Sequence, residues 1–235
     1  AANLPVSLDL VRQAAAGGAE FILTPEITNC LSSDRAHQRT VLRHEASDPT
    51  LAALCAEAAR LRVWLLIGSL GLLTDDADGR FANRSFLIAP DGTIGAHYDK
   101  IHMFDVNVSA TEQYRESSGY RPGARAVVAD TPFGRIGMTI CYDLRFPGLF
   151  RALAQAGATI LTVPAAFNDT TGAAHWESLL RARAIENGCF VLAPAQCGRH
   201  ATHEGRARRT HGHSLAVGPW GEVLADGGDE IGVTL

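Results

Sequence analysis

Apolar runs of strand length alternate along this sequence with segments that have the spacing of an amphipathic helix. Residues 63–73, VWLLIGSLGLL, are apolar almost throughout, which is typical of a strand covered on both faces. Residues 49–61 before them, PTLAALCAEAARL, place Leu and Ala on one helical face. The same order returns as a predicted helix over 148–158 and a predicted strand over 159–167. This alternation predicts an α/β fold of layered helices and sheets.

Two predicted hairpins interrupt the alternation and make the expected sheets mixed. RSFLIAPDGTIGAHY turns at Asp91–Gly92, and HSLAVGPWGEVLAD turns at Pro219–Gly221. Helices are also expected over 7–17 and 174–188, and strands over 20–26, 133–141 and 189–197. No internal repeat, low-complexity tract or linker divides the sequence, so it predicts a single domain over residues 1–235.

Charge and cysteine content exclude several classes of protein. The formal net charge of -4 lacks the basic excess of nucleic-acid-binding domains, so no nucleic-acid partner is expected. No apolar run approaches the length of a membrane span, and no signal peptide is visible. The 5 cysteines include no CxxC pair, which argues against a disulfide framework and for a reducing, cytoplasmic setting.

Three polar residues stand where predicted strands end. Glu26 follows FILTP, Lys100 follows IGAHYD and Cys141 follows IGMTI. Functional sites of layered α/β folds usually lie outside the carboxyl ends of strands, so these side chains are expected to meet. A carboxylate could take the proton of a thiol, and a lysine could stabilise an oxyanion. From these residues alone, Cys141 is either a small buried side chain or a nucleophile.

The motifs around these residues resemble the nitrilase, or carbon–nitrogen hydrolase, superfamily. They are TPE at 24–26, YDKIHMFDV at 98–106 and ICYDLRFPGLFRALAQAGA at 140–158. The resemblance continues through PAAFNDTTGAAHWESLLRARAIENGCFVLAPAQCGRH and GHSLAVGPWGEVLA. It implies a four-layer α-β-β-α sandwich with two mixed sheets. It also implies a core strand ahead of NLPVSLDL and further residues after IGVTL, neither of which is in this sequence.

The resemblance also implies a mechanism without a metal or organic cofactor. Glu26, Lys100 and Cys141 match the family's Glu–Lys–Cys triad in order, and Glu116 in YRESSGYRPG best matches its second glutamate. Glu26 is then the general base and Cys141 the nucleophile that forms a thioester. Lys100 and the backbone N–H of Tyr142 would hold the oxyanion. Glu116 would hydrogen-bond Lys100 or the substrate nitrogen.

The Nit branch of the superfamily is the most similar, through CYDLRFP, TTGAAHWESLLRARAIE and AQCGRH. This branch includes deaminated-glutathione amidases and ω-amidases that hydrolyse monoamides of 2-oxo-dicarboxylic acids. We expect an amidase for deaminated glutathione or a related 2-oxo-acid amide, with 2-oxoglutaramate or 2-oxosuccinamate as the alternative. A nitrilase or an N-carbamoyl amino acid hydrolase is also compatible with the resemblance. Two other classes stay open, a catalytically idle interaction protein and a thiol redox protein.

Such substrates carry a carboxylate, which requires a cationic partner. Arg145 is the candidate, since a guanidinium binds a carboxylate in bidentate fashion; the alternative is an ion pair with Asp143 or Glu186. Four residues that follow a predicted strand could line the pocket or cap the next helix: Phe167, Asn168, Thr170 and Thr171. His175 is expected to form structural hydrogen bonds.

The most basic stretch is RHATHEGRARRTHGH at 199–213. Three interpretations are open: a metal site, an anion-attracting rim of the pocket, and a solvated loop. Without an ordered Cys/His spacing, no metal site is predicted. The resemblance further implies a homodimer that associates through the helices 148–157 and 174–187.

Overall fold

A computed structural model describes residues 3–32, 34–109, 112–200 and 208–235. One mixed sheet is four-stranded, in the order β1-β2-β3-β4. Its strands are β1 (Phe21–Leu23), β2 (Trp64–Leu72), β3 (Ala82–Ile88) and β4 (Ile94–Asp99). β1 and β2 are parallel, whereas β3 pairs antiparallel with both of its neighbours. β3 and β4 form the hairpin predicted around Asp91–Gly92.

The second mixed sheet is six-stranded, in the order β14-β13-β10-β9-β8-β7. Its strands are β7 (Val127–Thr131), β8 (Gly134–Met138), β9 (Ile160–Thr162), β10 (Phe190–Ala193), β13 (Leu215–Val217) and β14 (Val223–Asp226). β8, β9 and β10 are parallel, and the outer strands pair antiparallel. The predicted mixed α/β fold is therefore confirmed.

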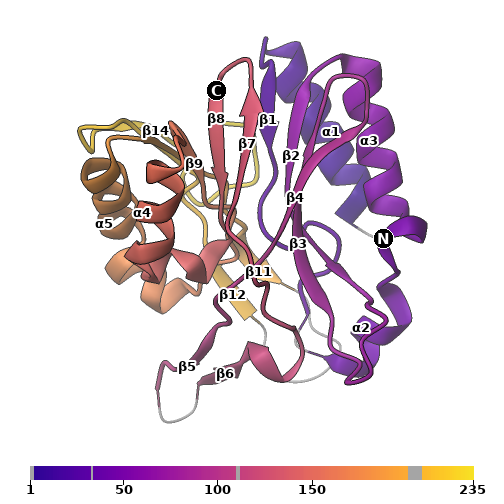
Figure 1. The fold of residues 1–235 in the computed structure, drawn as a ribbon. Helices are drawn as coiled ribbons and strands as arrows, with labels where there is room; N and C mark the ends of the chain where they lie inside the picture. The colour runs from indigo at the N-terminus through magenta and orange to yellow at the C-terminus, as the bar shows by residue number, and fades with distance from the viewer. Residues whose placement is uncertain (1–2, 33, 110–111, 201–207) are drawn as a thin grey trace.

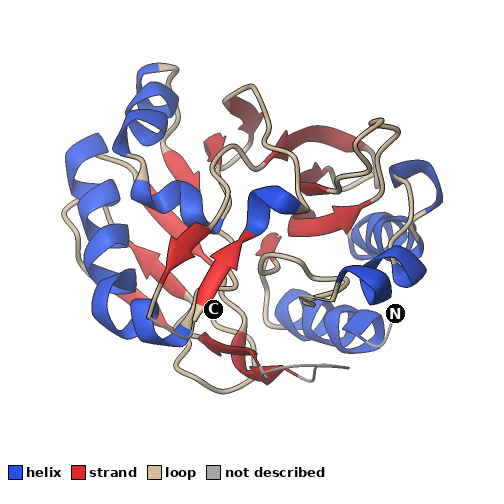
Figure 2. Ribbon diagram, turned by 90° about the horizontal axis from the view of Figure 1, so that it is seen from below, coloured by secondary structure: helices blue, strands red, loops and turns tan. Residues whose placement is uncertain are grey.

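Helices flank the two sheets on opposite sides (Figure 1). α1 (Asn3–Ala16) and α3 (Pro49–Leu61) lie beside the four-stranded sheet, and α4 (Pro147–Gln155) and α5 (Asp169–Asn187) beside the six-stranded one. Figure 2 shows the same order from below, with helices on two sides and strands between them. None of the helices within the described ranges is long and apolar enough to cross a bilayer.

Burial on both faces explains why β2 is apolar throughout. Leu65 and Ile67 share a buried cluster with Leu54 of α3, while Leu66 between them belongs to the cluster that contains Ile136 of the other sheet. Successive side chains of a strand point to opposite faces, so a strand between a helix layer and a second sheet needs apolar residues at every position. The core of the described residues accordingly lies between the sheets, beneath α4 and α5, and beneath α1 and α3, with a smaller cluster around Leu42 and Phe81.

α5 begins earlier than the predicted start at residue 174. The Asn168 side chain accepts a hydrogen bond from Thr171 N–H at 3.1 Å and caps the helix, so Thr170 and Thr171 belong to its first turn. The predicted Glu177–Arg181 pair is present at 3.1 Å.

Several short elements have no counterpart in the prediction. They are α2 (Arg35–Val41), the hairpin of β5 (Asp105–Asn107) and β6 (Gln113–Arg115), and the pair β11 (Cys197–His200) and β12 (Arg208–His211). Short 3₁₀-helices add Glu45–Ser47, Glu116–Ser118 and Cys141–Arg145. In Figure 1, β5, β6, β11 and β12 lie at the same end of the sheets. Part of the basic stretch, residues 201–207, lies outside the described residues.

Candidate active site

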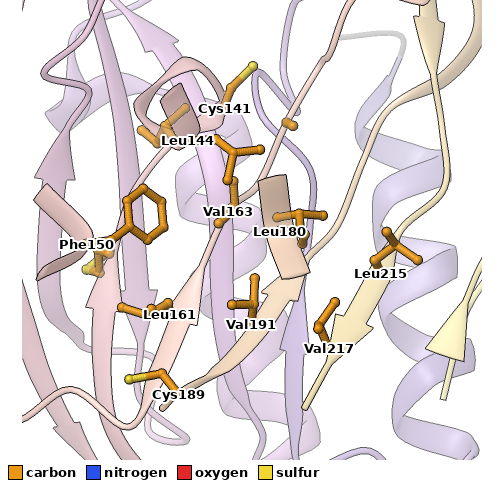
Figure 3. Packing of buried hydrophobic residues seen from close by; sticks show 14 of the residues in the cluster. Cys141, Leu144, Phe150, Leu161, Val163, Leu180, Cys189, Val191, Leu215 and Val217 are labelled. Atoms are coloured by element: carbon orange, nitrogen blue, oxygen red, sulfur yellow. The ribbon is translucent and has the colours of Figure 1, made fainter. Parts of the chain in front are cut away.

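The three predicted strand ends meet at one cavity. Glu26 follows β1, Lys100 follows β4 and Cys141 follows β8, and all three line a cavity of ≈ 420 Å³. Glu26 and Lys100 come from the four-stranded sheet, whereas Cys141 comes from the six-stranded one. Figure 3 shows Cys141 at the edge of the apolar cluster that underlies the second sheet. The cavity therefore joins residues of both sheets.

Lys100 lies between two carboxylates. Its Nζ is 2.9 Å from Glu26 Oε1 and 3.0 and 2.9 Å from the two oxygens of Glu116. Glu26 also accepts hydrogen bonds from Asn83 Nδ2 at 2.9 Å and from Ala166 N–H at 2.8 Å. Glu26 is 3% and Lys100 2% exposed. Protein groups, not water, therefore supply the hydrogen bonds and the opposite charges for both side chains.

The charges of this network follow from burial and proximity. Burial raises the pKa of Glu26, but the Lys100 ammonium, the hydrogen bond with Cys141 and the Arg208 charge together outweigh burial, so the net pKa is lowered. Burial lowers the pKa of Lys100, but Glu116 and Glu26 outweigh it and hold that pKa well above its usual range. Burial and then the Glu26 charge raise the pKa of the Cys141 thiol well above its usual value. The site therefore pairs a neutral thiol with a deprotonated carboxylate.

The nucleophile candidate occupies a strained turn between strand and helix. Cys141 has φ 48 and is the first residue of the 3₁₀-helix Cys141–Arg145. A positive φ is uncommon for a residue with a side chain, and such strain clusters at functional sites. Tyr142 lies in the first turn of this helix, where backbone N–H groups have no intrahelical partner. A substrate oxygen could accept a hydrogen bond there.

Asp143 connects this turn to the loop after β4. Its carboxylate is buried and accepts hydrogen bonds from Ile140 N–H at 2.8 Å and Tyr98 OH at 2.8 Å. The other oxygen accepts from His102 N–H at 3.0 Å and lies 2.7 Å from His102 Nδ1. Because Lys100 and His102 share one loop, Asp143 holds the Lys100 segment against the Cys141 segment.

The candidate binding residues divide into two groups. Phe167 and Asn168 line the cavity. Thr171 and Arg145 are not among the described residues that line it. Thr171 lies in the first turn of α5, behind the Asn168 cap, which agrees with the alternative that these residues cap the next helix.

Arg145 also does not form either of the ion pairs considered for it. Its Nη2 is 3.0 Å from His175 Nδ1, which agrees with a structural hydrogen bond for His175, and its guanidinium lies over the Phe167 ring at 5.7 Å. Glu186 pairs with Arg183 at 2.8 Å instead, and the Asp143 carboxylate accepts the hydrogen bonds described above. Arg145 therefore contacts Phe167 and His175 and is not among the described residues that line the cavity.

Other cavity residues were missed because the elements that carry them were not predicted. Arg35 and Gln38 come from α2, Tyr114 from β6 and Arg208 from β12. The basic character of 199–213 was a usable signal for Arg208, through its interpretation as an anion-attracting rim. Across the described part of the chain, no group of His, Cys, Asp and Glu side chains is arranged to hold a metal ion.

Known sequences resemble the chain along most of its length. The sequence model for Carbon-nitrogen hydrolase matches residues 1–234. A deaminated glutathione amidase of Yersinia enterocolitica is 45% identical over 215 residues, covering 91% of this chain and 73% of the relative. A protein of the same name from Rattus norvegicus is 41% identical over 237 residues, covering 99% and 71%.

Solved structures of related proteins have the same fold as this chain. The C. elegans NitFhit protein superposes with a TM-score of 0.87 at 34% identity over 98% of this chain, which spans 55% of that one. Saccharomyces cerevisiae Nit3, a member of branch 10 of the nitrilase superfamily, gives 0.83 at 27% identity, covering 97% and 80%. A variant of the Nesterenkonia sp. AN1 amidase with acrylamide added to its active site cysteine gives 0.80 at 25% identity, covering 97% and 83%. With its matching sequence, fold and strand-end residues, this chain belongs to the carbon–nitrogen hydrolase family and is a hydrolase.

Proposed function

We propose that this chain hydrolyses the amide bond of deaminated glutathione or a related 2-oxo-acid amide through a thioester on Cys141. The observation that carries the proposal is the buried Glu26–Lys100–Glu116 network beside the Cys141 thiol. The names of the relatives from Yersinia enterocolitica and Rattus norvegicus support the choice of substrate. The match over residues 1–234 supports a single catalytic domain.

In the first half of the reaction, Glu26 removes the thiol proton as Cys141 attacks the carbonyl carbon. Lys100 and the Tyr142 N–H donate hydrogen bonds to the oxygen that becomes negative. One such donor typically stabilises the transition state by about 3 kcal/mol. Glu116 keeps the Lys100 ammonium charged and oriented. The carbon–nitrogen bond then breaks, Glu26 returns its proton to the leaving nitrogen, and the acyl group remains on sulfur.

In the second half, water replaces the amine. Glu26, again a carboxylate, takes a proton from the water while its oxygen attacks the thioester carbon. The same two donors hold the second oxyanion. The carbon–sulfur bond breaks, the proton passes to the Cys141 sulfur, and the carboxylic acid leaves. Each proton that Glu26 accepts is returned, so the chain ends in its starting state.

The test compares Cys141→Ala with Cys55→Ala, which changes a half-buried cysteine of α3 that is not in the cavity lining. Acid and amine release from deaminated glutathione and 2-oxoglutaramate is followed by chromatography. Removal of a nucleophile is expected to lower kcat by roughly 10³-fold or more, whereas Cys55→Ala stays active. An acyl adduct at Cys141 in quenched wild-type protein is the second expected result. Retained turnover in Cys141→Ala would refute the mechanism.

We further propose that the chain acts as a homodimer in the cytoplasm. Five free cysteines fit a reducing compartment. Exposed apolar side chains at Ile185 of α5 and at Trp220 in the β13–β14 turn support association through this face. Sedimentation equilibrium of the wild type and of Trp220→Ser tests this. A monomeric wild type contradicts the dimer.

A further inference from the structure

The buried Asn83 side chain contacts both carboxylates of the candidate site. Asn83 lies on β3, an inner strand of the four-stranded sheet, and is 1% exposed. Its Nδ2 lies 2.9 Å from Glu26 Oε1 and 3.4 Å from Glu116 Oε1. An amide nitrogen carries two N–H groups, so it can donate one to each carboxylate. Lys100 Nζ contacts the same two oxygens at 2.9 and 3.0 Å. The two glutamates are therefore bridged by a cation and also by a neutral amide.

The oxygen of the same amide shows which contacts decide its orientation. Asn83 Oδ1 is buried and has no hydrogen-bond partner within the described residues. A buried polar atom without a partner is unfavourable, and few are found in folded proteins. Turning the amide over would place Oδ1 against two carboxylates and leave neither with an amide donor. Donation to Glu26 and Glu116 therefore fixes the amide, while its own oxygen stays without a partner in the described ranges.

All three N–H groups of the Lys100 ammonium are already used in this arrangement. Lys100 Nζ lies within 3.0 Å of three carboxylate oxygens, one of Glu26 and two of Glu116. In the proposed reaction Lys100 also donates to the oxyanion, so one of these oxygens has to lose its N–H. Glu116 Oε2 keeps a hydrogen bond from Phe104 N–H at 2.6 Å. At Glu116 Oε1, and at Glu26 Oε1, the remaining donor among the described residues is Asn83.

We propose that Asn83 is a positioning residue that keeps Glu26 and Glu116 hydrogen-bonded when Lys100 turns an N–H group to the oxyanion. Asn83 is not among the described residues that line the cavity, so it acts through the carboxylates and not on the substrate. A neutral donor is appropriate here, because a further cation beside Glu26 would weaken it as a base. The inference rests on the proposed amidase function and names the residue that supports its base and its oxyanion donor.

The kinetic test uses two substitutions that remove the donor but differ in packing. Asn83→Leu keeps most of the side-chain volume and Asn83→Ala does not. Both are expected to lower kcat for amide hydrolysis by about 10- to 100-fold, the effect of losing hydrogen bonds to charged groups, with little change in KM. Ser85→Ala is the matched control, because Ser85 is buried on the same strand and donates to the Ile67 carbonyl at 3.1 Å. It should keep the wild-type kcat. A loss in only one of the Asn83 variants, or a loss confined to KM, overturns the assignment.

The pH profile distinguishes donation to Glu26 from a purely structural role. Hydrogen bonds to a carboxylate favour its charged form, so losing the Asn83 donor raises the pKa of Glu26. Because Glu26 acts as a carboxylate, the acid limb of kcat/KM should move to higher pH by about 0.5–1 pH unit in both Asn83 variants and stay in place in Ser85→Ala. An acid limb that does not move overturns the assignment. The other charged or titratable groups near Glu26 in the described ranges are the same in all variants: Lys100, Glu116, Tyr120, Cys141 and Arg208.

Acylation by p-nitrophenyl acetate tests the assignment without the proposed substrate. The Cys141 sulfur takes the acetyl group, the ester carbon–oxygen bond breaks, nitrophenolate leaves and Glu26 receives the thiol proton. Slower nitrophenolate release in both Asn83 variants, with the wild-type rate in Ser85→Ala, supports the assignment even if no amide is hydrolysed and the proposed function fails. Equal release by wild type and the Asn83 variants, or none by the wild type, overturns it while leaving an observed amidase activity intact. Circular dichroism checks folding, and two unfolded Asn83 variants would assign Asn83 to the fold and overturn the positioning role.

Discussion

Cys141 illustrates how neighbouring charges control a single side chain. The thiol is 6% exposed and adjoins a carboxylate that opposes its ionisation, so burial and then Glu26 raise its pKa. Lys100 acts in the opposite direction but less strongly than burial and Glu26. A neutral resting thiol reacts slowly with electrophiles that Glu26 cannot assist. Nucleophilicity thus depends on proton transfer within the site.

This balance predicts an unusual effect of Glu26→Gln. The substitution removes the negative charge that raises the Cys141 pKa but keeps the Lys100 charge that lowers it, so the thiol pKa should fall. Iodoacetamide labelling followed against pH by mass spectrometry is expected to rise at a lower pH than in the wild type. Amide hydrolysis should be lost in the same variant because its base is gone. A labelling profile that moves to higher pH contradicts the charge assignment.

Glu57 connects two helices on the outer side of the four-stranded sheet. It lies on α3, is 6% exposed, and accepts a hydrogen bond from Arg12 Nε of α1 at 2.8 Å. Hydrogen bonds from Arg12 and then Arg60 lower its pKa from 4.5 to about 2. A carboxyl group with a lowered pKa in the folded state stabilises the fold above its unfolded pKa. That contribution disappears as pH falls from 4.5 to about 2.

Glu57→Gln should therefore unfold more easily at pH 7 than the wild type. The difference in the free energy of unfolding is expected to shrink as pH falls from 4.5 toward about 2, where the wild-type carboxyl group becomes protonated. Urea denaturation at a series of pH values measures it. Glu177→Gln, which breaks an exposed pair on α5, should change stability by less than about 0.5 kcal/mol. A Glu57→Gln difference that does not vary with pH would rule out the linkage.

The packing of the two sheets sets the geometry of the whole molecule and of its site. Leu66, Leu87 and Tyr98 of one sheet share a buried cluster with Ile136 and Met138 of the other. The proposed base and nucleophile come from different sheets, so this cluster holds them at a fixed separation. Loss of packing there should affect both stability and catalysis.

Leu87→Ala is expected to lower the free energy of unfolding by about 2–5 kcal/mol, because it removes buried methyl groups and leaves a cavity between the sheets. Guanidinium denaturation should show a lower midpoint with an unchanged m value. Ile94→Ala on β4, which is 41% exposed, is the control and should cost less than about 1 kcal/mol. A change smaller than that of the control would contradict this account of the core.

Some features of the fold follow from the pattern of consecutive residues, whereas others depend on contacts between residues far apart in sequence. Apolar runs predicted β2, the hairpins and the strand ends that carry Glu26, Lys100 and Cys141. A buried strand requires apolar side chains at neighbouring positions, and this pattern is visible in the sequence. Asn168 was among the residues that could cap the helix after β9, and the structure shows that it does cap α5. Short elements such as α2 leave too few residues for a periodic signal.

The amino-acid order was sufficient for the α/β fold, which depends on residue type and spacing along the chain. The candidate triad came from the resemblance of the motifs around Glu26, Lys100 and Cys141, because spacing alone left Cys141 as either a buried side chain or a nucleophile. The charge states of the site depended on segments far apart in sequence. Lys100 meets Glu26 across 74 positions, and the Ala166 N–H meets it across 140. Electrostatic energy depends on distance in space and on burial, so only the folded chain determines the charge states of Glu26, Lys100 and Cys141.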